Sequence, residues 1–168
     1  MAMDRTTKIY KAIVPFADIL LSGKILAIDP STGSQSSMPG YAWFEKGKLK
    51  ESGVIQVPLS LNRSQRLFEI SRTIREEFPV PDGLIVEYIP PITYRGKGMN
   101  KVSLMALQKA IGAIIASHPY EVFIEVPSAS WKKYKPSEYV KSDEYDAISI
   151  GLCAMAIAKQ VKIDTEEK

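Results

Sequence analysis

The pattern of apolar and polar positions divides most of the chain into short strands and longer helices. Lys24–Asp29 is a short apolar run that ends in an acid and precedes Pro-Ser-Thr-Gly. This is typical of a buried strand entering a turn. Gly40–Glu45 and Lys48–Val57 predict two further strands, joined by a tight turn at Gly47. The first part of the chain is therefore expected to form three consecutive strands.

The hydrophobic period changes after Asn62, where apolar residues recur at helical spacing. This first predicted helix carries Leu67, Ile70, Ile74 and Phe78 on its apolar face. Pro79 and Pro81 end it. Gly83–Glu87 follows as a second apolar strand that ends in an acid, and residues 88–100 are expected to form a basic loop.

A second helix, a strand and a last helix complete the pattern. The apolar stripe of the second helix consists of Leu104, Leu107, Ile111, Ile114 and Ile115. Glu121–Val126 is predicted to be a strand that Pro127 ends, and Ala147–Lys159 a helix buried on nearly all sides. This order predicts an α/β domain with a mixed five-stranded sheet flanked by helices, and it resembles the ribonuclease-H-like fold.

Composition and charge narrow the classes of partner only slightly. The 168 residues are 45% hydrophobic and 24% charged, with a net charge of +3 that permits a polyanionic partner. Cys153 is the only cysteine, which excludes an internal disulfide and a multi-cysteine zinc site and fits a reducing cytoplasm. The apolar stretch Ile9–Leu21 contains Lys11, Pro15 and Asp18, so no membrane partner is expected.

Four acidic residues are candidates for metal-dependent chemistry. Asp29 and Glu87 end predicted strands, where ligand sites of α/β sheets gather, and Asp143 and Asp146 begin the last helix on one face. Carboxylates without a histidine or cysteine cluster suit a hard cation such as Mg²⁺ or Mn²⁺. Two such ions about 4 Å apart activate a water and stabilise the leaving oxygen of a phosphodiester.

Each acid also has a simpler explanation. Asp29 precedes Pro30 and can cap a turn with its side chain. Asp143 and Asp146 can be partners of the helix dipole. Glu87 is harder to explain in this way, because a charge at the end of an apolar run is costly to bury unless it is paired or bound to a metal. The set of four is therefore a stronger signal than any member.

Several segments together resemble the motifs of RuvC-type Holliday junction resolvases, in the order of that family. They are Ile25–Gly33 with the following Gly40-Tyr-Ala, Leu84–Glu87, Leu107–Ala116, Val126-Pro127 with Trp131-Lys-Lys, and Asp143–Ala154 with its Asp-x-x-Asp-Ala pattern. The match covers about Lys24 to Lys159.

The resemblance implies a homodimer that makes paired nicks across a four-way DNA junction with Mg²⁺, which Mn²⁺ can replace. It implies that two ions per active site are held by Asp29, Glu87, Asp143 and Asp146. Lys132, or its neighbour Lys133, corresponds to the catalytic lysine of the family.

The chain departs from the family between Lys133 and Asp143, where bacterial members carry a longer stretch with Gly and Lys. This departure and the unusual N-terminus suggest a divergent phage or viral type acting in the cytoplasm of a bacterial cell or an infected host. We therefore predict an N-terminal extension at 1–23 that packs on the domain or on a partner subunit. A nuclease domain at 24–162 and a charged, frayed tail at 163–168 are predicted to follow.

Basic and aromatic residues supply candidates for DNA binding, because cations neutralise phosphates and rings stack on unpaired bases. They are Tyr88, Tyr94, Arg95, Lys97, Lys101, Lys132, Lys133 and Lys135. The alternative for these segments is a solvated surface, and Trp131 and Tyr134 can pack instead of stacking.

Three other functions fit parts of the pattern. An actin-like ATPase also places Asp, Gly and Thr after a strand, but it needs two such domains and a second phosphate loop. A junction-binding protein that does not cut is disfavoured by the presence of all four acids. Nucleases for flaps, other branched DNA or RNA-containing hybrids are not separated from a junction resolvase by these motifs.

Overall fold

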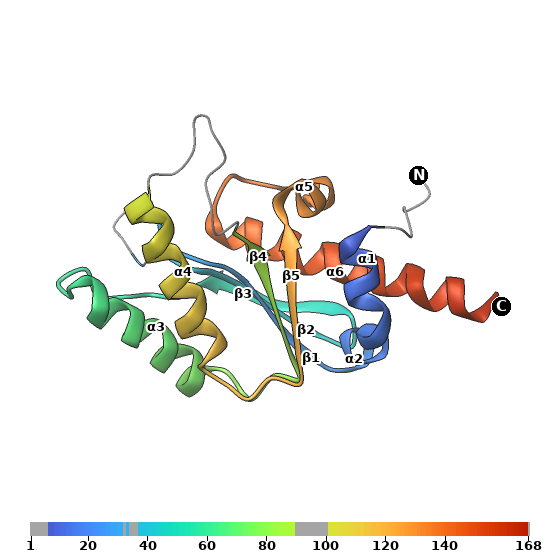
Figure 1. The fold of residues 1–168 in the computed structure, drawn as a ribbon, viewed down its shortest axis with the longest axis horizontal. Coiled ribbons are helices and arrows are strands. Elements are labelled where there is room, and N and C mark those ends of the chain that lie inside the picture. Colours follow the sequence, from blue (N-terminus) through green and yellow to red (C-terminus); the bar gives the residue numbers. More distant parts are fainter. Residues whose placement is uncertain (1–6, 32, 34–36, 90–100, 168) are drawn as a thin grey trace.

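A computed structural model describes residues 7–31, 33, 37–89 and 101–167 of the chain. These residues form a sheet that is covered by helices on both faces (Figure 1). The elements are α1 (Lys8–Ile13), η1 (Val14–Phe16), α2 (Ala17–Ser22), β1 (Lys24–Asp29), β2 (Gly40–Glu45), β3 (Lys48–Val54), α3 (Arg63–Glu77), β4 (Gly83–Tyr88), α4 (Lys101–Ile115), β5 (Val122–Pro127), α5 (Ser128–Trp131), η2 (Lys132–Tyr134) and α6 (Asp143–Glu166).

The sheet has five strands in the order β3-β2-β1-β4-β5. β1 and β3 are each antiparallel to β2, whereas β1, β4 and β5 are parallel to one another. This confirms the predicted mixed five-stranded sheet flanked by helices. Because β1, β4 and β5 run in the same direction, their carboxyl ends meet at one edge, which is where the candidate acids lie.

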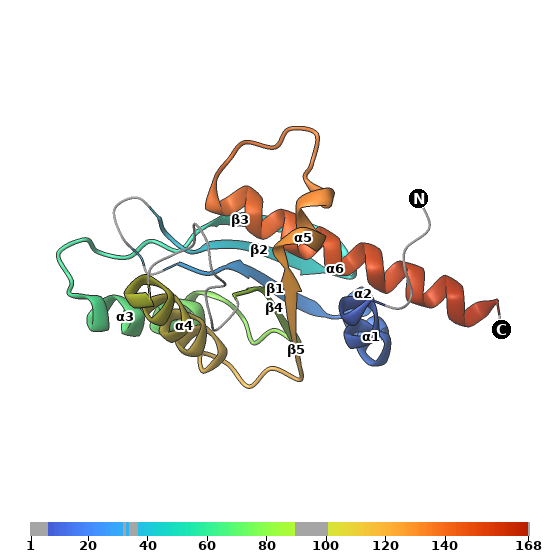
Figure 2. The same ribbon diagram turned by 45° about the horizontal axis from the view of Figure 1, so that its top comes forward.

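The alternation of side chains along the strands creates two cores. Leu26 and Ile28 of β1 face α3 and α4 and are fully buried there. Ile25 and Ala27 face the opposite side, where they pack with α6 and the N-terminal helices. Figure 2 shows these two helical layers on either side of the sheet. The sheet is therefore buried on both faces, as expected for strands rich in Ile, Leu and Val.

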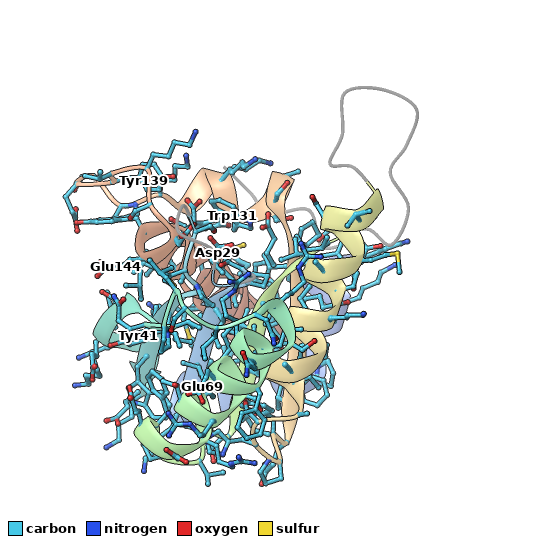
Figure 3. All side chains as sticks on the ribbon, turned by 90° about the vertical axis from the view of Figure 1, so that its left-hand side faces the viewer. Asp29, Tyr41, Glu69, Trp131, Tyr139 and Glu144 are labelled. Atoms are coloured by element: carbon cyan, nitrogen blue, oxygen red, sulfur yellow. The ribbon has the colours of Figure 1, made fainter. Side chains whose placement is uncertain are left out.

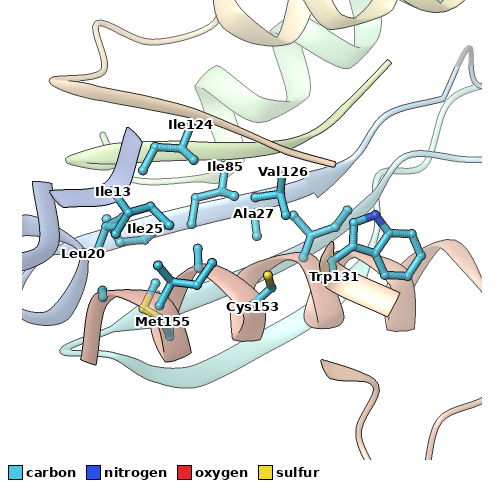
Figure 4. Close-up of a cluster of buried hydrophobic side chains, with 14 of the residues drawn as sticks. Ile13, Leu20, Ile25, Ala27, Ile85, Ile124, Val126, Trp131, Cys153 and Met155 are labelled. Atoms are coloured by element: carbon cyan, nitrogen blue, oxygen red, sulfur yellow. The ribbon is translucent and has the colours of Figure 1, made fainter. Parts of the chain in front are cut away.

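The residues before β1 pack on the same domain. Ile13 and Leu20, from α1 and α2, are fully buried in the α6-side core, beside Ile25 and Met155 (Figure 4). In the described part of this segment, residues 7–23, α1 and α2 pack on the domain. Among the described residues, no helix is both long enough and apolar enough to cross a membrane.

α6 is longer than predicted. The sequence pattern placed the helix at Ala147–Lys159 and a frayed tail at 163–168, but the helix runs from Asp143 to Glu166. The tail prediction is wrong at Asp164, which is buried and accepts a hydrogen bond from the hydroxyl of Tyr10 on α1. Packing against the N-terminal helices therefore holds the last turns of α6 in place.

Candidate active site

Two of the predicted acids are neighbours at the edge of the sheet where the parallel strands end. Asp29 is the last residue of β1, and Glu87 lies near the end of β4. The two strands pair with Ile28 opposite Val86, so the residues that follow lie side by side. The strand-end prediction thus places two carboxylates together, one from each strand.

Asp143 and Asp146 reach the same place because α6 begins directly over the end of β1. Gly40 pairs with Asp29 across the β1–β2 ladder. A Cβ atom added to Gly40 would lie 1.8 Å from the carbonyl oxygen of Asp143, which no side chain tolerates. Glycine at this position therefore allows the start of α6 to descend onto the sheet and brings its acids to Asp29.

We expect Gly40→Ala to move the start of α6 away from the sheet and to lower the free energy of unfolding by about 1 to 3 kcal/mol, measured by urea denaturation. Mn²⁺ binding should weaken in the same variant. Gly112→Ala is the matched control, because a Cβ there meets no atom within 4 Å. In the middle of α4 it should be neutral or stabilising by up to about 1 kcal/mol. Equal behaviour of the two variants would contradict the close approach at Gly40.

Asp29, Glu87 and Asp146, but not Asp143, line a pocket of about 570 Å³ that also carries basic residues. Its lining consists of Asp29, Glu87, Trp131, Lys132, Lys135, Tyr139, Lys141 and Asp146. Figure 3 faces this end of the molecule, with the labelled Trp131 and Tyr139 above Asp29. A pocket with carboxylates beside lysines suits a metal ion together with a phosphate. The carboxylates attract the cation, and the lysines attract the phosphate.

Burial and the charges of neighbouring acids make Asp29 and Glu87 difficult to ionise. Burial raises the pKa of Asp29 to about 8, and the charges of Glu87, Asp146 and Asp143 add to the effect. Burial also raises the pKa of Glu87, although the Trp131 hydrogen bond and Lys132 oppose this. Converging carboxylates of this kind are stabilised in their charged form by a bound cation.

Three side chains donate hydrogen bonds to the acids. The indole Nε1 of Trp131 donates to Glu87 at 3.1 Å, and Ser37 Oγ donates to Asp143 at 3.4 Å. The Tyr139 hydroxyl donates to Asp146 Oδ1 at 2.6 Å. Burial and this hydrogen bond raise the pKa of Tyr139 to about 12, so the phenol remains a donor at neutral pH.

The donor atoms fit a hard divalent cation, but the acids are not arranged in a ready-made ligand set. Within the described part of the chain, no group of three or more acidic, histidine or cysteine side chains is placed to hold a metal ion as it stands. Like charges repel one another when no cation lies between them, which favours such a spread. Side-chain rotation would be needed to bring the four carboxylates around an ion.

The structure separates the candidates for DNA binding. Lys132 and Lys135 line the pocket of the acids. Lys133 is exposed, and its charge acts on Cys153. Burial raises the pKa of the Cys153 thiol, and the charge of Lys133 opposes this effect. Tyr88 lines a different groove, beside α1. Tyr94, Arg95 and Lys97 lie outside the described residues, as does the side chain of Lys101 at the start of α4.

Sequence reasoning missed the partners of the acids. Trp131 was considered for stacking or packing, and the structure shows it 3% exposed, packed in the core with its indole on Glu87. Tyr139 and Lys141 were not singled out, although both lie in the short stretch that departs from the family pattern. No periodic or motif signal marks these residues, because they lie in an irregular segment before α6.

Comparisons with known proteins agree on the fold. No family profile matches the sequence, and no curated protein matches it either. Among solved structures, Thermus thermophilus RuvC in complex with a Holliday junction substrate is 15% identical, with a TM-score of 0.57, over 83% of this chain and 96% of that chain. The yeast mitochondrial Holliday junction resolvase Ydc2 is 12% identical, with a TM-score of 0.61, over 96% of this chain and 90% of that chain. At these identities the likeness establishes the RuvC-type fold that the motifs predicted.

Proposed function

We propose that this protein is a divalent-metal-dependent endonuclease that resolves branched DNA, above all four-way junctions, by phosphodiester hydrolysis. The observation that carries the proposal is the convergence of Asp29, Glu87 and Asp146 in one pocket with three lysines. The charges of Glu87, Asp146 and Asp143 add to the raised pKa of Asp29, so these three acids lie close enough to act on Asp29. The Holliday junction substrate bound by the structurally similar Thermus RuvC favours a junction over other DNA.

Asp29, Glu87, Asp143 and Asp146 would hold the metal, which we propose to be two Mg²⁺ ions, replaceable by Mn²⁺. When bound, such ions supply a nucleophilic water and stabilise the leaving oxygen of a phosphodiester. The four carboxylates offer oxygen ligands, which both ions prefer.

The surrounding residues would orient the acids and the phosphate. Trp131 fixes one oxygen of Glu87 and, being almost fully buried, keeps water from the core side of the pocket. Lys132 and Lys135 would hold the phosphate by charge-assisted hydrogen bonds, as would Lys141. We favour Lys132 as the catalytic lysine, because its charge acts on Glu87 whereas the charge of Lys133 acts on Cys153.

A homodimer is part of the proposal. A four-way junction has to be cut in two strands at symmetric positions, and a two-fold dimer presents two identical active sites for this. We propose that it acts in the cytoplasm. The second candidate remains a junction-binding protein that does not cut, which the spread of the acids keeps open.

The test is a cleavage assay of the full chain on four-way junctions, three-way junctions, flaps, RNA–DNA hybrids and linear duplex. We expect the four-way junction to be cut with Mg²⁺ or Mn²⁺, at least about tenfold faster than the duplex, a difference of about 1.4 kcal/mol in activation free energy. Excess chelator should abolish cutting. Full activity in chelator rules out the metal mechanism, equal cutting of all substrates rules out junction selectivity, and binding without cutting favours the second candidate.

A further inference from the structure

Tyr139 connects a candidate metal ligand to a basic residue at the rim of the pocket. Its hydroxyl donates to Asp146 Oδ1 at 2.6 Å. The ammonium of Lys135 lies 3.9 Å from the centre of its ring. The ring also meets Tyr145 edge to face, with centroids 6.0 Å apart. The phenol is therefore held at both its polar end and its aromatic face.

The segment that carries Tyr139 has few other anchors. Lys135, Val140 and Lys141 are exposed, and Val140 retains 61% of its surface. A turn places Tyr139 by a hydrogen bond from its backbone N–H to the carbonyl of Pro136, at 3.0 Å. Tyr139 thus connects this exposed segment to Asp146 and Tyr145 in the first turn of α6.

We propose that Tyr139 is a positioning residue for Asp146, and that Lys135 on its ring couples the binding of a DNA phosphate to the orientation of that carboxylate. This inference rests on the proposed function and assigns a role to the short stretch that departs from the family. Neither residue needs to touch the reacting atoms for this role.

The hydrogen bond can orient Asp146 without blocking it. A carboxylate offers about four lone-pair positions, so a bond to Oδ1 leaves Oδ2 free for a cation. Fixing the direction of one acid lowers the cost of gathering several like charges around an ion. Hydrogen-bond partners of ligating carboxylates typically contribute 10- to 100-fold in metal affinity.

Lys135 strengthens this arrangement from the other side of the ring. The ammonium over the face of the ring makes a cation–π contact, which holds the ring in the position from which its hydroxyl reaches Asp146. The same ammonium lies at the rim with Lys132 and Lys141, where a phosphate would approach. A phosphate held by Lys135 would therefore restrict the ring, and through its hydroxyl the Oδ1 atom of Asp146.

Two substitutions separate these contributions. Tyr139→Phe keeps the ring under Lys135 and loses only the hydroxyl, so Mn²⁺ affinity of the full chain without DNA should fall about 10- to 100-fold. Its melting temperature and junction affinity without metal should change little. Lys135→Met should weaken junction binding and lower its salt dependence by about one phosphate contact, with a smaller loss of Mn²⁺ affinity.

Tyr41→Phe is the matched control, because it also removes a tyrosine–carboxylate hydrogen bond, to Glu51 at 2.8 Å, but outside the pocket. Titration calorimetry with Mn²⁺ measures all variants. Unchanged Mn²⁺ affinity in Tyr139→Phe, or equal losses in Tyr139→Phe and Tyr41→Phe, would overturn the inference and leave the proposed function standing. If the unsubstituted protein binds no Mn²⁺, the proposed metal site fails and the inference fails with it.

Discussion

Asp29→Asn, Glu87→Gln and Asp146→Asn are each expected to reduce junction cleavage in Mg²⁺ by about a thousandfold or more. Each substitution removes a charged ligand from the proposed metal site, where bound ions contribute several kcal/mol of transition-state stabilisation. Junction affinity should fall less than about threefold, because removing a negative charge from the pocket does not weaken phosphate contacts. Single-turnover cleavage and gel-shift titration on the same junction measure the two effects.

Glu51→Gln provides the control for these variants, since Glu51 is exposed on β3 and bonds Tyr41 rather than facing the pocket. It should cut at the unsubstituted rate. Retained turnover in any two of the three site variants would refute the assignment of the acids. Loss of junction binding together with cleavage would indicate unfolding instead, which the melting temperature distinguishes.

The metal-free protein is expected to lose stability as pH rises from about 4 to about 8, and Asp29→Asn should remove much of this loss. The pKa of Asp29 is raised from 3.8 to about 8 in the folded chain, by burial first and then by the neighbouring acids. The folded state therefore binds a proton that the unfolded state releases, and stability falls with pH across this window. The effect reaches up to about 4 kcal/mol at pH 7.

Thermal melting in chelator from pH 4 to pH 8 measures this dependence. Near pH 7.5 we expect Asp29→Asn to melt about 5 to 10 °C above the unsubstituted protein. Glu121→Gln, at an exposed acid, should follow the unsubstituted curve. Mg²⁺ should reduce the pH dependence of the unsubstituted protein, because a cation compensates the charge of Asp29. Identical melting curves for Asp29→Asn and the unsubstituted protein in chelator would show that the pKa of Asp29 is not raised in the folded state.

The sheet and the location of the acids could be predicted because they depend on local patterns. Apolar runs ending in Asp29 and Glu87 identify buried strands, and parallel strands place their carboxyl ends at one edge. The spacing of Asp143 and Asp146 identifies one face of a helix start. These patterns can be recognised without knowing any distant contact, and they were sufficient to predict the fold and the acidic residues that line the pocket.

The remaining features depend on contacts that no local pattern of residues marks. The motif marks Gly40, but its reason is visible only where the backbone of α6 lies against it. Asp164 carries the charge of a solvated tail, yet Tyr10 pairs with it in the interior. Tyr139 sits in an exposed segment with no periodicity, and only its distance to Asp146 gives it a role. Composition and spacing contain no information about such pairs.

The length of α6 gives the N-terminal helices an influence at long range. A helix of 24 residues extends about 36 Å, so it behaves as a rigid rod with Asp143 and Asp146 at one tip. α1 and α2 pack against the C-terminal half of α6, and Asp18 forms a salt bridge with Lys162 at 2.7 Å. A protein shortened to begin at Lys24 would lose this packing and expose the apolar residues of α6 that α1 and α2 cover. The start of α6, with Asp143 and Asp146, would then be held mainly by its packing on β1 and β2.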